Sequence, residues 1–336
     1  MVYEHPAMRE GGPCEIMPGM YGVRLALPFA LDHVNVWLFA TRDGWSVVDA
    51  GLADERTRER WRELRGRLLA DRPIARVVVT HNHPDHMGLA GWLCAETGAE
   101  LWTSRTEWLF ARLFAQDVSE EWVAAGRRFD RRAGLDEEAI EERAGRGNLY
   151  RRRVVPPPAS FRRVQDGDRL RLGDTEWQVV VGRGHAPEMI CLFDPAANVL
   201  IAGDQVLPRI SPNVSVWPSQ PEADPLSEFL GSLARFRELP EDCLVLPSHG
   251  RPFRGLHARI DQLVAHHEER LAATLEACAA SATLAEVMPR LFDRALDGHQ
   301  LQFALGESLA HLNCLIERGE LSRQLDADGR LRYRVR

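Results

Sequence analysis

The sequence of 336 residues contains no lysine, so all 42 of its positively charged side chains are arginines. This absence excludes Schiff-base chemistry and phosphate binding by a Walker lysine. Long apolar runs are also absent, and the first residues, MVYEHPAMREGG, lack the basic and apolar parts of a signal peptide. We therefore expect a soluble, cytoplasmic protein that has no membrane partner.

The six cysteines are scattered, and no two of them have the C-x-x-C spacing of a zinc knuckle or a redox motif. The net charge of −7 argues against a protein built mainly to bind nucleic acid, although a local basic patch would not be excluded. With 45% hydrophobic and 27% charged residues, the composition is that of a globular protein long enough for two domains.

Five short apolar runs are predicted to be strands, and each is followed closely by a residue that can bind a metal or hold a ligand. The runs 45–48, 76–80, 177–181, 199–203 and 244–248 precede Asp49, His81, His185, Asp204 and His249. Helical patterns cover 54–69, 88–97 and 225–238 between these runs. The chain therefore has mixed α/β character, with its polar side chains at strand ends, where such proteins place their chemistry.

The segment THNHPDH at positions 80–86 is the most informative motif. Imidazole and carboxylate groups suit zinc and similar ions, and four of them within six residues are costly to order unless a metal binds them. With His185, Asp204 and His249 the candidate ligands number seven. Seven are too many for one tetrahedral ion but suit two ions that share a bridging carboxylate.

This segment resembles the H-x-H-x-D-H motif of the metallo-β-lactamase superfamily. The resemblance implies that one ion is held by His81, His83 and His185, the other by Asp85, His86 and His249, and that Asp204 bridges them. It also implies that Asp49 orients a ligand imidazole. Two divalent ions per chain are expected, zinc first, with iron or manganese as alternatives.

The same resemblance implies a fold and a division into domains. The expected fold class is α/β, an αββα sandwich over 1–258 with a helical insertion at about 104–150. Helices at 259–280, 283–291 and 302–318 and a hairpin of 321–324 with 331–335 follow. They are similar to the winged-helix-like domain of the β-lactamase-like protein 2 group. Because residues 281–336 hold eight arginines and eight acids, we expect packing, homodimer contacts or an active-site wall there rather than DNA binding.

Two ligand positions and one neighbouring position distinguish branches of the superfamily. A histidine at 83 favours a hydrolytic zinc pair over the flavodiiron electron carriers, which resemble this motif but have glutamate there. An aspartate at 204, where the best-known β-lactamases have cysteine, weakens an antibiotic-hydrolase interpretation. Homoserine-lactone lactonases have a tyrosine where this chain has Leu207.

The predicted activity is hydrolysis of a carboxylic ester, thioester or lactone by a metal-bound hydroxide, with Asp85 as the catalytic carboxylate that passes a proton. A phosphodiesterase or endoribonuclease of the same fold is the alternative, since it needs the same metals. An iron-dependent enzyme of the persulfide-dioxygenase kind is a less favoured alternative, because it needs only one metal and this sequence has a complete second set of ligands. A binding protein without turnover has no motif in its favour. Substrate identity, native metal and oligomeric state are left open.

Several other residues have competing interpretations. Phe29, Arg209 and Trp217 are candidates for the substrate pocket, against core packing for the aromatic rings and solvent exposure for the arginine. Glu188 is a candidate neighbour of His185, and His33 a weaker candidate ligand. The adjacent histidines 266 and 267 point about 100° apart on a helix, so we expect them to be core or surface residues.

Residues 143–163 contain seven arginines and no acid, whereas 117–142 contain nine acids and four arginines. One hypothesis is that the two blocks pair with each other. The other is that the arginines at 151–153 present a cationic rim to an anionic handle of a small-molecule substrate.

Overall fold

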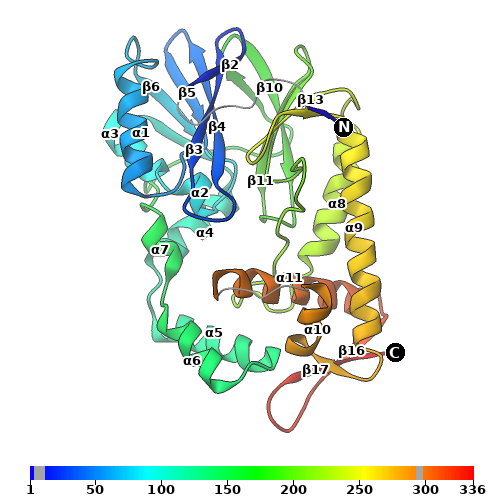
Figure 1. The fold of residues 1–336 in the computed structure, drawn as a ribbon. Helices are drawn as coiled ribbons and strands as arrows, with labels where there is room; N and C mark the ends of the chain where they lie inside the picture. The colour runs from blue at the N-terminus through cyan, green and yellow to red at the C-terminus, as the bar shows by residue number, and fades with distance from the viewer. Residues whose placement is uncertain (4–11, 293–297) are drawn as a thin grey trace. The chain divides into compact units, whose positions relative to one another are not determined.

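A computed structural model describes residues 1–3, 12–292 and 298–336 (Figure 1). Its contacts divide the chain into two compact units. The first comprises Met1–Gln116, Leu149–Pro212 and Arg235–Ile260, and the second Asp117–Asn148, Asn213–Ala234 and Asp261–Arg336. The domain boundary at 258/259 stays a prediction. None of the helices in the described ranges is long and apolar enough to span a membrane.

The first unit contains two seven-stranded sheets. One has the order β2 (Cys14–Met17), β3 (Met20–Ala26), β4 (His33–Thr41), β5 (Gly44–Val48), β6 (Ile74–Val78), β7 (Glu100–Thr103) and β8 (Arg162–Arg163). The other has the order β1 (Val2–Tyr3), β14 (Phe253–Arg254), β13 (Leu244–Pro247), β12 (Val199–Gly203), β11 (Met189–Asp194), β10 (Thr175–Gly182) and β9 (Arg169–Leu172).

Strand β4 shows how the first sheet separates two cores. Trp37 and Phe39 belong to the core that the two sheets share, where Phe39 meets Trp177 edge-on with ring centroids 5.4 Å apart. Val36 and Leu38 belong to a second core on the opposite face. Because alternate side chains of a strand point to opposite faces, a strand buried on both sides is continuously apolar.

Helices cover that second face of the sheet (Figure 1). Helix α1 (Glu55–Gly66), capped by the Asp54 side chain, buries Trp61 and Leu64 there, and α3 (Ala90–Thr97) buries Leu93. The apolar residues of α1 lie at helical spacing, so one face packs on the sheet while arginines and glutamates face solvent.

Parallel pairing places the candidate ligands. Strands β5 and β6 are parallel, and so are β12 and β13. Because parallel strands end at the same edge, Asp49 and His81 follow neighbouring strands of one sheet, and Asp204 and His249 follow neighbouring strands of the other.

The stretch predicted to be helical after residue 103 contains four helices. Helices α4 (Arg105–Gln116) and α7 (Leu149–Arg153) belong to the first unit. Helices α5 (Glu120–Ala133) and α6 (Glu137–Gly145) belong to the second unit. Their N-cap residues are Ser119 and Asp136, whose side chains accept hydrogen bonds from backbone amides.

The rest of the second unit consists of helices and a small sheet. It includes α8 (Pro225–Phe236) and α9 (Leu256–Ala277) for most of their lengths, then β15 (Ala282–Thr283), α10 (Leu284–Leu291), α11 (Gly298–Glu317), β16 (Leu321–Leu325) and β17 (Leu331–Val335). The sheet order is β15-β17-β16. Thr283 and Glu286 form a capping box that starts α10. These elements follow the predicted pattern closely, and the winged-helix assignment stays a prediction.

Candidate metal centre

Seven side chains from separate segments of the first unit converge at the ends of its strands. His81 and His83 follow β6, and Asp85 and His86 lie on the short helix α2 (Pro84–Met87), which begins with proline at its first position. The remaining three follow β10, β12 and β13 and are His185, Asp204 and His249.

The ligand atoms form three overlapping groups, in each of which all atoms lie within 4.8 Å of one another. The groups are His81, His83 and His185, then His81, His86 and Asp204, then Asp85, His86 and His249. Asp204 also lies 3.5 Å from His185 Nε2 and 3.3 Å from His249 Nε2 through its Oδ2. One carboxylate therefore faces members of both histidine sets.

The buried polar atoms of this cluster fit a divalent cation. His86 Nε2 and Asp204 Oδ1 are fully buried, and neither has a hydrogen-bond partner among the described residues. The two atoms lie 3.5 Å apart. An unsatisfied buried polar atom costs about 1–3 kcal/mol, which coordination to a metal would remove. Imidazole nitrogen and carboxylate oxygen are also the donor types that zinc prefers.

Charges within the cluster separate the histidines into two kinds. Burial and the neighbouring imidazoles lower the pKa of His81 well below its usual value, and burial with His185 lowers the pKa of His83 to about 3. Burial also opposes the charge on His86, but Asp85, Asp49 and Asp204 outweigh it and raise its pKa to about 9. The carboxylates thus attract positive charge on one side of the cluster.

The two carboxylates are correspondingly acidic. Burial favours the neutral form of Asp204, yet His249 and His86 hold the pKa of this carboxyl well below its usual value. The pKa of Asp85 is likewise lowered, because His86 and His249 overcome the effect of burial. Both groups are therefore ionised at neutral pH, as metal ligands must be.

Asp49 connects the cluster to the sheet. Its Oδ2 accepts a hydrogen bond from His86 Nδ1 at 2.8 Å, and its Oδ1 accepts one from the backbone amide of Thr80 at 2.8 Å. Asp49 adopts a positive φ of 66°, a strained conformation for a residue other than glycine. This carboxylate fixes the ring of His86 with Nε2 directed into the cluster.

His33 holds His249 through its backbone. The His33 carbonyl oxygen accepts a hydrogen bond from His249 Nδ1 at 2.6 Å, which leaves His249 Nε2 to face the carboxylates. The His33 ring itself accepts from the backbone amide of Gly250 and contacts Asp32. His33 belongs to none of the three groups that could hold a metal.

Glu107 is a structural residue that sequence analysis missed. It is fully buried on α4 and accepts hydrogen bonds from the backbone amide of Asn82 at 2.8 Å and from that of Glu188 at 2.7 Å. Burial raises the pKa of Glu107 to about 7, against these hydrogen bonds. It joins the loops that carry His83 and His185. In sequence it is the only acid of α4, and its partners lie 25 and 81 residues away.

The candidate pocket residues have separate surroundings. Phe29 packs against the core, and the Arg153 guanidinium lies 4.8 Å from its ring centroid. Arg209 is exposed and lies over the Tyr3 ring at 5.7 Å. Trp217 belongs to the second unit, where its ring meets Phe303 edge-on. Glu188 accepts a hydrogen bond from the Thr106 amide.

The first arginines of the arginine-rich segment pair with acids of the preceding block. Arg143 pairs with Asp130 at 2.8 Å, and Arg146 pairs with Glu142 at 2.7 Å. Arg153 instead lies over Phe29, and Asp85 acts on its charge, while burial lowers its pKa. Pairing with the acidic block thus accounts for the first arginines of the segment and leaves Arg153 beside the candidate metal centre.

Comparison with known families identifies the chain. Residues 30–249 match the model of the metallo-beta-lactamase superfamily. The chain belongs to this superfamily. Residues 271–336 match a second model, the C-terminal domain of metallo-beta-lactamase-like proteins. The mixed α/β fold with two sheets, expected from the sequence, is confirmed as that of the superfamily.

Solved structures and one characterised relative extend the comparison. A beta-lactamase domain protein from Burkholderia ambifaria is 42% identical, with a TM-score of 0.92 over 100% of this chain and 98% of that one. A metallo-beta-lactamase family protein from Thermus thermophilus is 29% identical, with a TM-score of 0.82 over 96% and 100%. A protein of Bos taurus named acyl-coenzyme A thioesterase MBLAC2 is 26% identical over 66% of this chain and 75% of its own length. These comparisons support a metallo-hydrolase.

Proposed function

We propose that this superfamily member is a dinuclear metal-dependent hydrolase of a carboxylic ester, thioester or lactone. The observation that carries the proposal is the shared carboxylate. Asp204 lies 3.5 Å from His185, a member of one ligand set, and 3.5 and 3.3 Å from His86 and His249, members of the other. Two sets of ligands joined by one carboxylate suit a pair of ions better than a single ion.

The groups of neighbouring ligand atoms suggest which residues would hold which ion. His81, His83 and His185 would hold one ion, Asp85, His86 and His249 the other, and Asp204 both. Bound divalent ions would supply Lewis acidity that lowers the pKa of water towards 7 and polarises a substrate carbonyl. Zinc is the proposed ion because the donors are imidazole nitrogens and carboxylate oxygens.

The surrounding residues would keep these ligands in place and handle protons. Asp49 and the His33 carbonyl each accept the Nδ1 hydrogen of a ligand histidine, which fixes the tautomer that leaves Nε2 as the donor atom. The Asp85 side chain is 21% exposed, whereas those of Asp204 and Asp49 are 8% and 1% exposed. Asp85 would therefore be the carboxylate that takes a proton and returns it to a leaving group.

A thioester with an anionic handle is the substrate class that we favour within this group. The bovine relative is named as an acyl-coenzyme A thioesterase, and Arg153 places a guanidinium over Phe29 near Asp85. Guanidinium groups recognise phosphates and carboxylates through paired hydrogen bonds. Cytoplasmic location and a homodimer remain predictions.

A substrate panel tests the proposal. Metal-loaded and chelator-treated protein would be compared on p-nitrophenyl esters, acyl thioesters, lactones and bis-p-nitrophenyl phosphate. We expect turnover of a carbonyl substrate by the metal-loaded protein only. Phosphodiester cleavage without carbonyl hydrolysis would instead favour the nuclease alternative, and turnover that survives chelation would overturn metal-dependent hydrolysis.

A further inference from the structure

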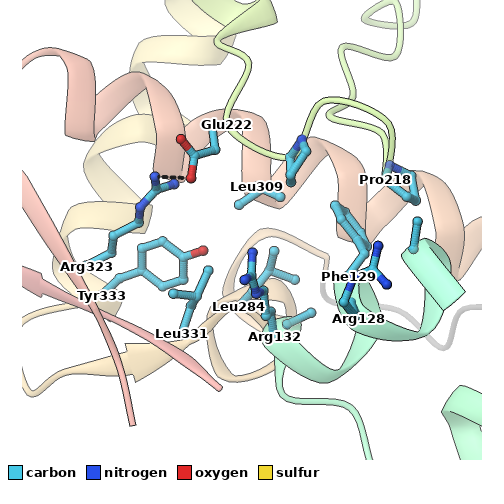
Figure 2. Close-up of a pocket in the computed structure, with 13 residues that line it drawn as sticks. Arg128, Phe129, Arg132, Pro218, Glu222, Leu284, Leu309, Arg323, Leu331 and Tyr333 are labelled. Carbon is cyan, nitrogen blue, oxygen red and sulfur yellow. Dashed lines mark ion pairs between the residues drawn. The ribbon is translucent and has the colours of Figure 1, made fainter. Parts of the chain in front are cut away.

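A cavity of about 290 Å³ lies within the second unit. Three segments distant in sequence line it: helix α5, residues 218–222, and the C-terminal residues from α10 to β17 (Figure 2). Sites for small organic ligands begin at about 300 Å³, so the cavity suits a small ligand. None of the proposed metal ligands lines it, and all of them belong to the first unit.

Its inner wall is apolar. Phe129, Leu284 and Leu309 are all buried and line the cavity. Figure 2 shows these side chains around a common space with Pro218. Such a wall would shield an alkyl or aryl group from water.

Helix α5 supplies charge to the same cavity. Arg128 and Arg132 lie on the helix face that also carries Phe129, because residues three and four apart are neighbours on a helix. Their sequence neighbours Arg127 and Arg131 form ion pairs with glutamates of α6. Arg128 and Arg132 form no ion pair with any residue that the structure describes.

The third segment adds two polar groups. Arg323 lines the cavity and pairs with Glu222 at 2.6 Å, but the Glu222 side chain is 70% exposed. The lining therefore carries three arginines and one glutamate, a positive excess of two charges.

Tyr333 is the other polar group, and it is 1% exposed. Its hydroxyl points into the cavity (Figure 2), which Tyr333 lines. Burial raises the pKa of Tyr333, against the influence of Arg323 and Arg132, so the hydroxyl stays protonated and can donate. A hydroxyl that faces the cavity can donate to a ligand that accepts a hydrogen bond.

We propose that this cavity is a binding site for an amphipathic carboxylate, such as a medium-chain fatty acid. The carboxylate would accept hydrogen bonds from the Tyr333 hydroxyl and from Arg132, and Arg323 would add positive charge. The alkyl chain would pack against Phe129, Leu284 and Leu309. The site is separate from the proposed hydrolytic centre and does not depend on its activity.

Calorimetric titration of the metal-loaded protein with octanoate tests the site. Octanol and octyl phosphate serve as neutral and more highly charged probes of the same chain length. We expect octanoate to bind more tightly than either. No binding of octanoate at millimolar concentration, equal binding of octanol, or tighter binding of octyl phosphate would each overturn the proposal.

Variants separate this cavity from the metal centre, which could also attract carboxylates. Arg132→Gln should weaken octanoate binding about tenfold, and Tyr333→Phe by a smaller factor, because each removes a hydrogen bond to a charged group. Arg131→Gln is the matched control on the same helix, since Arg131 pairs with Glu137 outside the cavity. Circular dichroism would verify that each variant folds.

Unchanged octanoate affinity in both folded cavity variants would place the ligand elsewhere and overturn the proposal. Ester or thioester hydrolysis should be the same in wild type and in these variants. A failure of the cavity proposal is thus distinguishable from a failure of the proposed hydrolase activity.

Discussion

Each unit of this protein buries a group of histidines, and the two groups differ in the acidic side chains that surround them. In the first unit Asp49, Asp85 and Asp204 surround His86 and raise its pKa to about 9 despite burial. In the second unit His267 lies on α9 and His311 on α11, and His267 Nδ1 is 3.3 Å from His311 Nε2. Burial and adjacent positive groups lower the pKa of His267 to about 2, and burial lowers that of His311 to about 4.

The difference shows what distinguishes a metal centre from a histidine core. Clustered imidazoles alone are stable as neutral, hydrogen-bonded groups, as when His311 Nδ1 donates to the Glu307 carbonyl at 2.7 Å. Carboxylates placed among imidazoles create a site that favours positive charge. None of the groups suited to a metal among the described residues includes a histidine of the second unit.

Replacing a proposed metal ligand of the first unit should have the largest effect, and the effect should be on hydrolysis. His81 belongs to two of the three groups, so His81→Ala should lower kcat/KM by about a thousandfold or more. Steady-state hydrolysis by the metal-loaded variant measures this. His257→Ala is the control, because the His257 ring bonds the Leu239 carbonyl at the start of α9 and belongs to none of the three groups. Equal losses in the two variants would contradict the assignment.

Lowering the pH should reduce the stability of the second unit through its buried histidines. The folded-state pKa of His311, about 4, lies below the unfolded value of about 6.5. The unfolded state therefore binds more protons as pH falls, and the stability present above pH 6.5 is lost towards pH 4. His311→Gln should reduce the loss between pH 6.5 and pH 4.5 by about 2 kcal/mol relative to wild type.

Hydrogen exchange of the α11 amides would measure that difference within the second unit. Burial raises the pKa of Glu307 to about 7, which contributes a pH dependence of opposite sign. Glu307 is present in both proteins, so its contribution cancels in the comparison. An unchanged pH dependence in the variant would show that folding does not lower the pKa of His311.

Replacing Asp49 should affect the metal centre less than replacing one of its proposed ligands. Asp49→Asn keeps the shape of the side chain but removes the charge that faces His86, so metal affinity should fall at least about tenfold. Competition with a chromogenic chelator measures the affinity. Asp43→Asn changes an exposed acid of the β4–β5 turn and should leave it unaltered. If both variants bind metal like wild type, Asp49 does not support the centre.

The cationic rim should give the smallest effect. Replacing the arginines at 151–153 with glutamine should raise KM for an acyl-CoA a few fold and leave KM for a neutral ester unchanged. Raising salt from about 50 to about 300 mM should act on the wild type in the same direction. A matched control replaces three arginines that each pair with a glutamate, namely Arg127, Arg131 and Arg146. Equal responses of both substrates would contradict a role in substrate binding.

Much of the first unit was predictable from local patterns. The apolar runs before His81, Asp204 and His249 are strands β6, β12 and β13. Helix α1 and its Asp54 cap follow from residues close together in sequence. The superfamily was recognisable because several potential ligands lie within the short segment 80–86.

Contacts between distant segments were not predictable in the same way. Glu107 joins Asn82 and Glu188 only after α4 has packed, and no local pattern indicates these distant partners. In α5 the repeated Arg-Arg pairs look alike, yet one member of each pair faces glutamates and the other faces a cavity. That distinction depends on α6, the next helix in the sequence, and on distant residues such as those of β17.

The proposed function depends on two metal ions in the first unit that Asp204 would join. Metal analysis of protein purified without chelator tests it most directly, together with the same analysis of His86→Ala and His249→Ala. The account predicts two divalent ions per chain in the wild type, and loss of one ion with most of the activity in each variant. Full activity with one ion per chain, unaffected by either substitution, would contradict it.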